Sequence, residues 1–156
     1  MNGCFGCDPV NPAGLGMIFY LDALGRLSAS CTPNETHKGL GRIVNGGLVT
    51  TFAEELAAAA AGAKGDGGLV VAKVEVAYER PAYVGAELRG VVTATSREKK
   101  AVNVSVDVSN EAGRVAVLNA TFVLITEERL RERAGIGLEA APACLVAGRR
   151  LLPPEA

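Results

Sequence analysis

One long apolar helical run, residues 46–63, is the feature that most constrains the fold of this 156-residue chain. The run opens with a Gly-Gly pair and contains five consecutive alanines at 57–61, and alanine has the highest helix propensity. Only Glu54 and Glu55 place charge within it. Because a helix that is apolar on nearly all sides must be buried, the rest of the chain has to supply a surface that encloses it.

Segments of alternating hydrophobicity predict β-strands before and after this helix. Two short strands precede it and four long ones follow, at residues 17–22, 26–32, 70–78, 88–95, 102–109 and 114–126. The short connections between the later strands favour hairpins, which require antiparallel pairing. The sequence therefore predicts an α+β protein, with an antiparallel sheet of about six strands wrapped around one long central helix. A single helix leaves part of such a sheet uncovered, so we expect a second copy to continue the sheet in a homodimer.

The length of the chain favours one domain. We predict this domain over residues 1–133, with an extended lead-in at 1–16 and a short charged helix at 127–133. Residues 134–156 mix Gly, Pro and Ala without periodicity, which predicts a poorly ordered C-terminal tail.

Charge and hydropathy argue against two classes of partner. The net charge is −1, which gives no electrostatic footprint for nucleic acid or for an anionic membrane. No apolar stretch approaches the ~20 residues of a membrane-spanning helix, and the first residues lack the basic and apolar regions of a signal peptide. We therefore expect a cytoplasmic protein.

The four cysteines are expected to be thiols in a reducing compartment. Cys4 and Cys7 form a CxxC pair, which is half of a common zinc site, and the other ligands would have to come from Cys31, His37 or Cys144. We favour the alternative, small apolar thiols in an N-terminal loop, and predict neither a metal nor a cofactor.

The start of the long helix contains groups that can polarise a carbonyl and activate water. The first N–H groups of a helix lack acceptors, and glycine at position 46 lets a ligand approach the backbone closely. Glu54 shares a helix face with Thr50 and Thr51, whereas Glu55 lies on a more apolar face, so Glu54 is the predicted reactive carboxylate. The alternative for both glutamates is exposure at one edge of the helix.

Four segments occur in an order and at a spacing that are specific for one fold. They are CFGC…NPAGL at 4–15, HKGLGRIVNGG at 37–47, TFAEE at 51–55 and VEVAYERPAYVGAELRG at 74–90. Together they resemble the CFxCG…NPxGL, HxGxxGIVHGG, TLxDE and vxYlrPvxvGexlxg motifs of hotdog-fold thioesterases, in the PaaI-like branch of the 4-hydroxybenzoyl-CoA thioesterase superfamily. The resemblance covers residues 4–126 and implies a hotdog fold and hydrolysis of a small-molecule acyl- or aryl-CoA thioester, with coenzyme A entering only as part of the substrate.

The resemblance also implies roles at the helix start. The Gly46 amide falls on the family's carbonyl-polarising donor, Glu54 on its catalytic carboxylate, and Asn45 on a position usually held by histidine. In the family these groups come from two subunits, which implies a site across a dimer interface and allows a dimer of dimers. Glu54 would act as a general base on water or as a nucleophile. Asn45 would donate a hydrogen bond to the substrate or only cap the helix.

Further residues are expected to contact the substrate: Gly47, Thr50, Thr51, His37, Arg97, Lys99 and Lys100. The three basic ones cluster at a hairpin and would bind CoA phosphates, although a solvated turn is the more usual state of such a cluster. His37 is the only histidine, and a solvated loop position is the alternative expected for it.

Two alternatives to a thioesterase stay open. One is a catalytically weak or inactive hotdog domain that binds acyl-CoA or another ligand, since Asn45 cannot carry a proton as histidine does. The other is a hydratase-type enzyme of the same fold, which the lack of a histidine at the helix entry disfavours.

Overall fold

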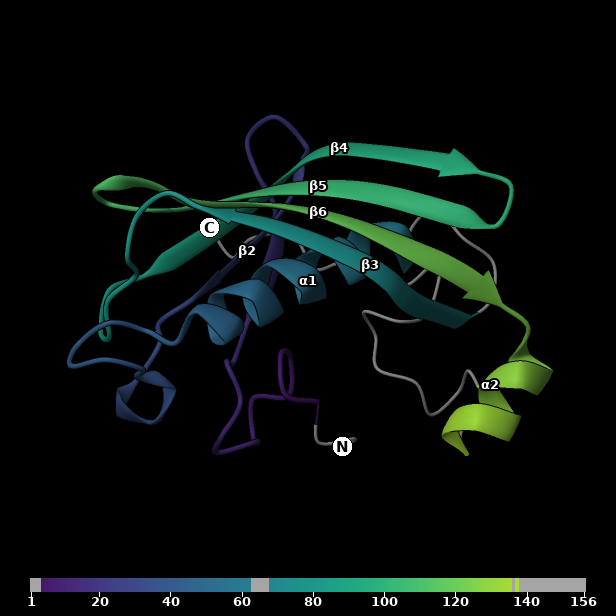
Figure 1. Ribbon diagram of the computed structural model, residues 1–156, viewed down its shortest axis with the longest axis horizontal. Helices are drawn as coiled ribbons and strands as arrows, with labels where there is room; N and C mark the ends of the chain where they lie inside the picture. Colours follow the sequence, from purple (N-terminus) through teal and green to yellow (C-terminus); the bar gives the residue numbers. More distant parts are fainter. Residues whose placement is uncertain (1–3, 63–67, 136, 138–156) are drawn as a thin grey trace.

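The computed structural model describes residues 4–62, 68–135 and 137. Along the chain its elements are β1 (Ile18–Leu21), β2 (Leu27–Cys31), the short 3-10 helix η1 (Glu35–His37), α1 (Gly46–Gly62), β3 (Gly68–Tyr78), β4 (Leu88–Glu98), β5 (Ala101–Asn110), β6 (Gly113–Ile125) and α2 (Glu127–Ala134). Figure 1 shows a curved sheet above α1, with α2 beyond one end of the sheet. The six predicted strands and the two predicted helices are all confirmed.

The predicted tail at 134–156 lies outside the described residues, apart from positions 134, 135 and 137. The domain boundary at residue 133 therefore stays a prediction. Neither α1 nor α2, the helices of the described ranges, combines the length and the hydrophobicity that crossing a membrane requires.

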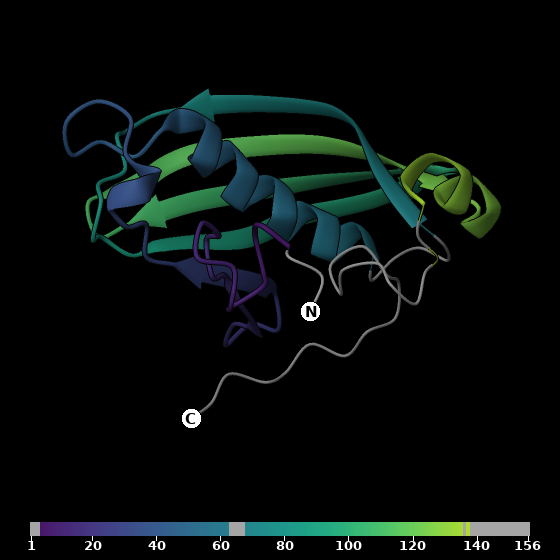
Figure 2. The same cartoon turned by 90° about the horizontal axis from the view of Figure 1, so that it is seen from below.

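The strands form one antiparallel sheet with the order β1-β2-β4-β5-β6-β3. α1 crosses one face of the sheet, so the strand that follows it, β3, pairs with β6 at the far edge and not with β2. β-Bulges at Val71/Lys73 in β3 and at Val92/Ala94 in β4 bend these strands. Figure 2 shows α1 crossing one face of the resulting curved sheet, so the predicted wrapping around a central helix is confirmed.

The contact between α1 and the sheet is built from small and branched residues. In β5 every second residue from Val102 to Val108 is buried, and on α1 Phe52 and Leu56 are fully buried. Gly90 of β4 lets the helix come close, because a Cβ there would lie 2.7 Å from Leu56 Cδ2 and 3.0 Å from Phe52 Cε1. The core therefore fixes the position of α1, and with it the residues on the open side of the helix.

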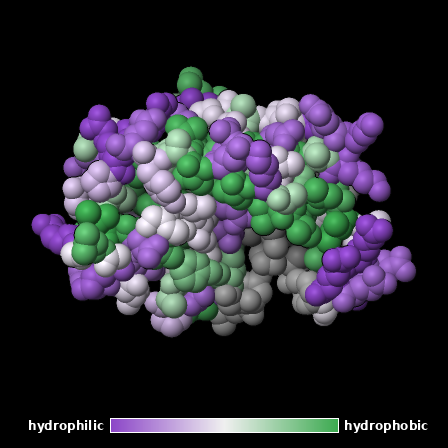
Figure 3. Space-filling view, viewed as in Figure 1, coloured by the Kyte–Doolittle hydropathy of each residue, from purple (hydrophilic) through white to green (hydrophobic). Residues whose placement is uncertain are grey.

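The two edges of the sheet differ. β1 has 4 residues, whereas β3 has 11 and exposes large apolar side chains along its length. Their exposed fractions are 45% for Val70, 43% for Val71, 36% for Val74 and 53% for Tyr78. Figure 3 views the molecule from the β3 side and shows several hydrophobic patches there. A long edge strand of this kind is open to pairing with another strand.

Candidate active site

The helix start leaves one backbone donor available. Asn45 precedes α1, and its side-chain oxygen accepts a hydrogen bond from the Gly47 N–H at 2.8 Å, in the manner of an N-cap. The Asn45 N–H itself donates to the His37 carbonyl at 3.0 Å. Within the described part of the chain the Gly46 N–H has no acceptor, and Gly46 is exposed. A ligand oxygen would therefore meet the Gly46 donor, while the Asn45 side chain is already engaged in capping.

Tyr78, at the end of β3, contacts the first residue of α1. Its hydroxyl donates to the Gly46 carbonyl at 2.8 Å and lies next to Thr50 Oγ1, within hydrogen-bonding distance. The ring lies over Gly46, since a Cβ at Gly46 would be 3.5 Å from the tyrosine Cζ and hydroxyl oxygen. Sequence reasoning assigned no role to Tyr78, because its partners lie 28 and 32 residues earlier in the chain.

Glu54 lies two turns further along α1 and is half-buried. Burial, and then the neighbouring Glu55 carboxylate, raise the pKa of Glu54 from 4.5 to about 7. No hydrogen bond or ion pair joins Glu54 to another described residue. Thr50 and Thr51, which share its helix face, donate their hydroxyls to the helix carbonyls of Gly46 and Gly47 at 3.2 and 2.9 Å. The result is a carboxyl group that gains or loses its proton near neutral pH.

Glu55 has a different environment from Glu54. The N-terminal lead-in covers it, and a Cβ at Gly6 would lie 2.7 Å from both Cγ and Cδ of Glu55. The lead-in therefore packs on Glu55, whereas helical spacing places Glu54 on the face of Thr50 and Thr51.

The expectation that His37 lies in a solvated loop is wrong. The side chain is 2% exposed, its Nδ1 accepts from the Asn34 N–H at 3.0 Å, and its Nε2 lies 3.3 Å from the Ala13 carbonyl oxygen. His37 therefore closes η1 and ties it to the lead-in. With both ring nitrogens engaged inside the protein, the structure does not present His37 to a substrate.

The basic cluster does not lie beside Gly46 within one chain. The β4–β5 hairpin carries Arg97, Lys99 and Lys100, and Figure 1 shows it at the opposite end of α1 from Gly46. Arg97 and Lys100 line a cavity of about 820 Å³. Because Glu127, Glu128 and Glu132 of α2 line the same cavity, it offers an anion a mixed rather than a basic surface.

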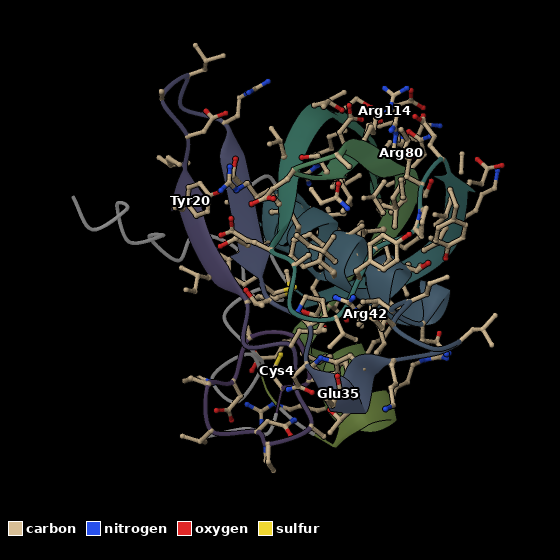
Figure 4. All side chains as sticks on the ribbon, turned by 90° about the vertical axis from the view of Figure 1, so that its left-hand side faces the viewer. Cys4, Tyr20, Glu35, Arg42, Arg80 and Arg114 are labelled. Carbon is tan, nitrogen blue, oxygen red and sulfur yellow. The ribbon has the colours of Figure 1, made fainter. Side chains whose placement is uncertain are left out.

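A smaller cavity, of about 370 Å³, opens at the helix start. Its lining includes Gly46 and Tyr78, the apolar side chains of Ile43, Val44, Val49, Pro81, Ala82 and Val115, and the charged residues Glu79 and Arg80. Glu79 pairs with Arg114 at 2.7 Å, and Figure 4 shows Arg114 beside Arg80 at this end of the molecule. Gly46 thus borders a largely apolar cavity whose lining also includes the charged residues Glu79 and Arg80.

A metal centre has no ligand set in the described ranges, where no three His, Cys, Asp or Glu side chains come together in a way that could hold an ion.

Known proteins resemble this chain in sequence over the residues of the candidate site, and in fold. The model of the Thioesterase superfamily matches residues 41–117, which include Gly46, Glu54 and Tyr78. A comparison with curated protein sequences finds no match.

Several solved structures share the fold. A mutant of the phenylacetic acid degradation protein PaaI from Thermus thermophilus is 23% identical, with a TM-score of 0.65 over 76% of this chain and 100% of that one. PaaI from the phenylacetic acid degradation operon of E. coli is 17% identical, with a TM-score of 0.60 over 71% and 80% of the two chains. A thioesterase from Haemophilus influenzae is 16% identical, with a TM-score of 0.60 over 72% and 80%.

The family match and the fold together identify the class. The chain has the hotdog fold, and its residues 41–117 belong to the thioesterase superfamily, as its motifs predicted. The similarity to two PaaI proteins agrees with the PaaI-like motifs in the sequence.

Proposed function

We propose that this protein hydrolyses a small-molecule acyl- or aryl-CoA thioester. The observation that carries the proposal is the combination on α1 of an available Gly46 N–H, at the positive end of the helix dipole, and a half-buried Glu54 with a pKa of about 7. An amide donor of this kind stabilises the oxyanion that develops on a thioester carbonyl. A carboxyl group with a pKa near the working pH is suited to general-base catalysis.

The proposed site requires two copies of the chain. Glu54 lies eight residues beyond Gly46, which corresponds to about 12 Å along a helix. A water held by Glu54 would be too far from a carbonyl bound at Gly46 of the same helix, because attack needs contact at about 3 Å. A second copy whose α1 runs antiparallel would bring its own Glu54 to the first copy's Gly46.

The exposed edge strand supports this assembly. β3 offers an unpaired edge and the apolar side chains Val70, Val71 and Val74, and it lies on the side of the sheet where Tyr78 meets the helix start. Pairing of β3 with β3 of a second copy would bury these side chains and continue the sheet as an isologous dimer. A dimer of dimers is compatible with this arrangement.

The proposed reaction is a single hydrolysis. Glu54 of one subunit takes a proton from water, and the hydroxide attacks the thioester carbon while the oxyanion accepts from the other subunit's Gly46 N–H. The intermediate then expels the CoA thiolate, which takes the proton back from Glu54, and the acid leaves. A direct attack by Glu54 would give an anhydride instead, and incorporation of ¹⁸O from water into Glu54 would distinguish that route.

The cavity beside Gly46 is proposed to take the acyl group, since its walls are mainly apolar and its volume is about 370 Å³. CoA is then only a part of the substrate, and the reaction needs no other cofactor. A cytoplasmic location, as the sequence predicts, fits this substrate.

A second function is a hotdog domain that binds acyl-CoA without turnover. The Asn45 side chain favours it, because this residue replaces the usual histidine and its oxygen is taken by the Gly47 N–H. A panel of acyl- and aryl-CoA thioesters with detection of the released thiol separates the two, since binding without release of thiol would leave only the second function.

The Gly46 donor is best tested with a pair of variants. Gly46→Pro removes the N–H at the first helical position, where proline is well tolerated, whereas Gly46→Ala also adds a Cβ but keeps the N–H. We expect the proline variant to lose about 10²–10³-fold in kcat, and the alanine variant to lose far less. Equal loss in both variants would contradict the role of the amide.

The two-subunit site is tested by complementation. Gly46→Pro and Glu54→Gln are each expected to be nearly inactive. After co-expression in equal amounts, about half of the dimers are mixed, and each has one intact site, so about a quarter of the wild-type activity should return. A mixture that stays inactive although mixed dimers are present would place both groups of a site in the same subunit.

A further inference from the structure

The N-terminal lead-in is a closed loop fastened to the body of the protein. Leu15 donates its N–H to the Phe5 carbonyl at 2.8 Å, and Met17 donates to the Gly6 carbonyl at 2.9 Å. Leu15 and Met17 are buried in the core. The loop therefore has a defined position on the core. A covalent change within the loop would act on the residues that pack against it.

Two sulfur atoms meet in this loop. The Cys7 thiol donates to Cys4 Sγ at 2.8 Å, and the Cys7 backbone N–H also points to that sulfur at 3.3 Å. A disulfide has an S–S distance of about 2.05 Å, so the two sulfurs need to approach by less than about 1 Å. Both residues are only partly buried, whereas Cys31 is 5% exposed and lies in the core. Among the three cysteines of the described residues, Cys4 and Cys7 are thus the pair close enough to form a disulfide.

This pair lies against the helix of the proposed site. Gly6, between the two cysteines, packs on the side chain of Glu55, which is the immediate neighbour of Glu54. The Glu55 carboxylate also acts electrostatically on Cys4. Figure 4 shows Cys4 on the same side of the molecule as Glu35 of η1. The contact between His37 of η1 and the Ala13 carbonyl joins this short helix to the lead-in.

We propose that Cys4 and Cys7 are a modification site, forming a reversible disulfide with a low-molecular-weight disulfide as the oxidant, and that this bond changes the activity of the Glu54 site through Gly6 and Glu55. The Cys7 thiolate attacks one sulfur of the oxidant and releases one thiol. The Cys4 thiolate then attacks the mixed disulfide, closes the Cys4–Cys7 bond and releases the second thiol. The two cysteines lose two protons and two electrons, and the oxidant is reduced to two thiols.

The order of the two attacks follows from the environment of Cys4. Burial raises the pKa of Cys4 to about 11. Cys4 is thus a poor first nucleophile at neutral pH, and it closes the bond only when a mixed disulfide has formed beside it. The activity part of this inference rests on the proposed thioesterase function, whereas the disulfide itself does not.

The test equilibrates the full chain in glutathione buffers of increasing oxidation, followed by alkylation and mass spectrometry. We expect loss of one pair of alkylatable thiols, mapped to the peptide with Cys4 and Cys7, and full recovery with dithiothreitol. Cys4→Ser and Cys7→Ser should abolish the loss, and Cys31→Ala should retain it. Failure to form the bond in fully oxidised glutathione, pairing with another cysteine, or tight binding of Zn²⁺ by the reduced pair would each overturn the site.

Activity gives the second readout. The oxidised and reduced proteins should differ in kcat/KM by about twofold or more, and the Cys4→Ser, Cys7→Ser double variant should not respond to the oxidant. A disulfide that forms without any change in kcat/KM would overturn the coupling to Glu54. If no thioester is hydrolysed at all, the proposed function fails, and the mass spectrometric result still decides whether the disulfide forms.

Discussion

Replacing Glu54 by glutamine should stabilise the protein at alkaline pH while it removes activity. The unfolded chain releases the Glu54 proton near pH 4.5, and the folded chain near pH 7. Between these values the folded state holds a proton that the unfolded state has lost, so this group's contribution to stability is complete below about pH 4.5 and is lost as the pH rises through 7. Glutamine keeps the size of the protonated side chain and does not ionise, so it does not incur this loss.

The magnitude follows from the pKa shift and the exposure of the side chain. A shift from 4.5 to about 7 would correspond to about 3 kcal/mol for a fully enclosed carboxyl group. Because Glu54 is only half-buried, solvent screening reduces this to about 1–2 kcal/mol. The free energy of unfolding of Glu54→Gln should therefore exceed that of the wild type by about 1–2 kcal/mol at about pH 8 and by little at about pH 4.5.

Urea unfolding at the two pH values and at one protein concentration measures this difference. Glu111→Gln, in the exposed β5–β6 turn, is the matched control and should show no comparable gain. A Glu54→Gln variant that is no more stable than the wild type at the higher pH, or that gains equally at both pH values, would refute the burial argument.

Three other perturbations test the fold and the site. Tyr78→Phe removes a hydroxyl that bonds to the helix start and should lower kcat about tenfold with an unchanged circular dichroism spectrum; unchanged kcat would leave Tyr78 only a packing role. Gly90→Ala places a Cβ against Leu56 and should lower the free energy of unfolding by about 1–3 kcal/mol in urea, whereas a neutral result would show that the helix can move away from the sheet. Val74→Glu puts charge on the exposed edge strand and should give an inactive, folded monomer by sedimentation; an active dimer would exclude pairing through β3.

The fold was predictable because its signals are local and repeated. Alternate valines from Val102 to Val108 predict a strand with one buried face, and the alanine run predicts a buried helix without knowledge of any contact. Sequence reasoning missed η1, since a turn of three residues capped by Asn34 has no periodicity. The burial of His37 depends on the Ala13 carbonyl, 24 residues away, and no local pattern reports such a contact.

The site was predictable in part. Helical spacing places Glu54 and Glu55 on different faces of the helix. The structure adds a difference that spacing cannot predict, because Gly6 of the lead-in packs on Glu55. The amide of Gly46 follows from its place at the helix start, but the contribution of Tyr78 depends on where β3 ends in three dimensions. The roles of Arg97, Lys99 and Lys100 as phosphate ligands stay predictions.

The position of Tyr78 gives the protein an intrinsic optical probe. The chain has no tryptophan and three tyrosines, so ultraviolet fluorescence comes from tyrosine alone. Tyr78 lies against Gly46, whose amide a ligand oxygen would approach, whereas Tyr20 is in β1 and Tyr83 lies between β3 and β4. In a variant with Tyr20 and Tyr83 replaced by phenylalanine, emission would report on the helix start alone, so titrations could follow its occupation without an attached dye.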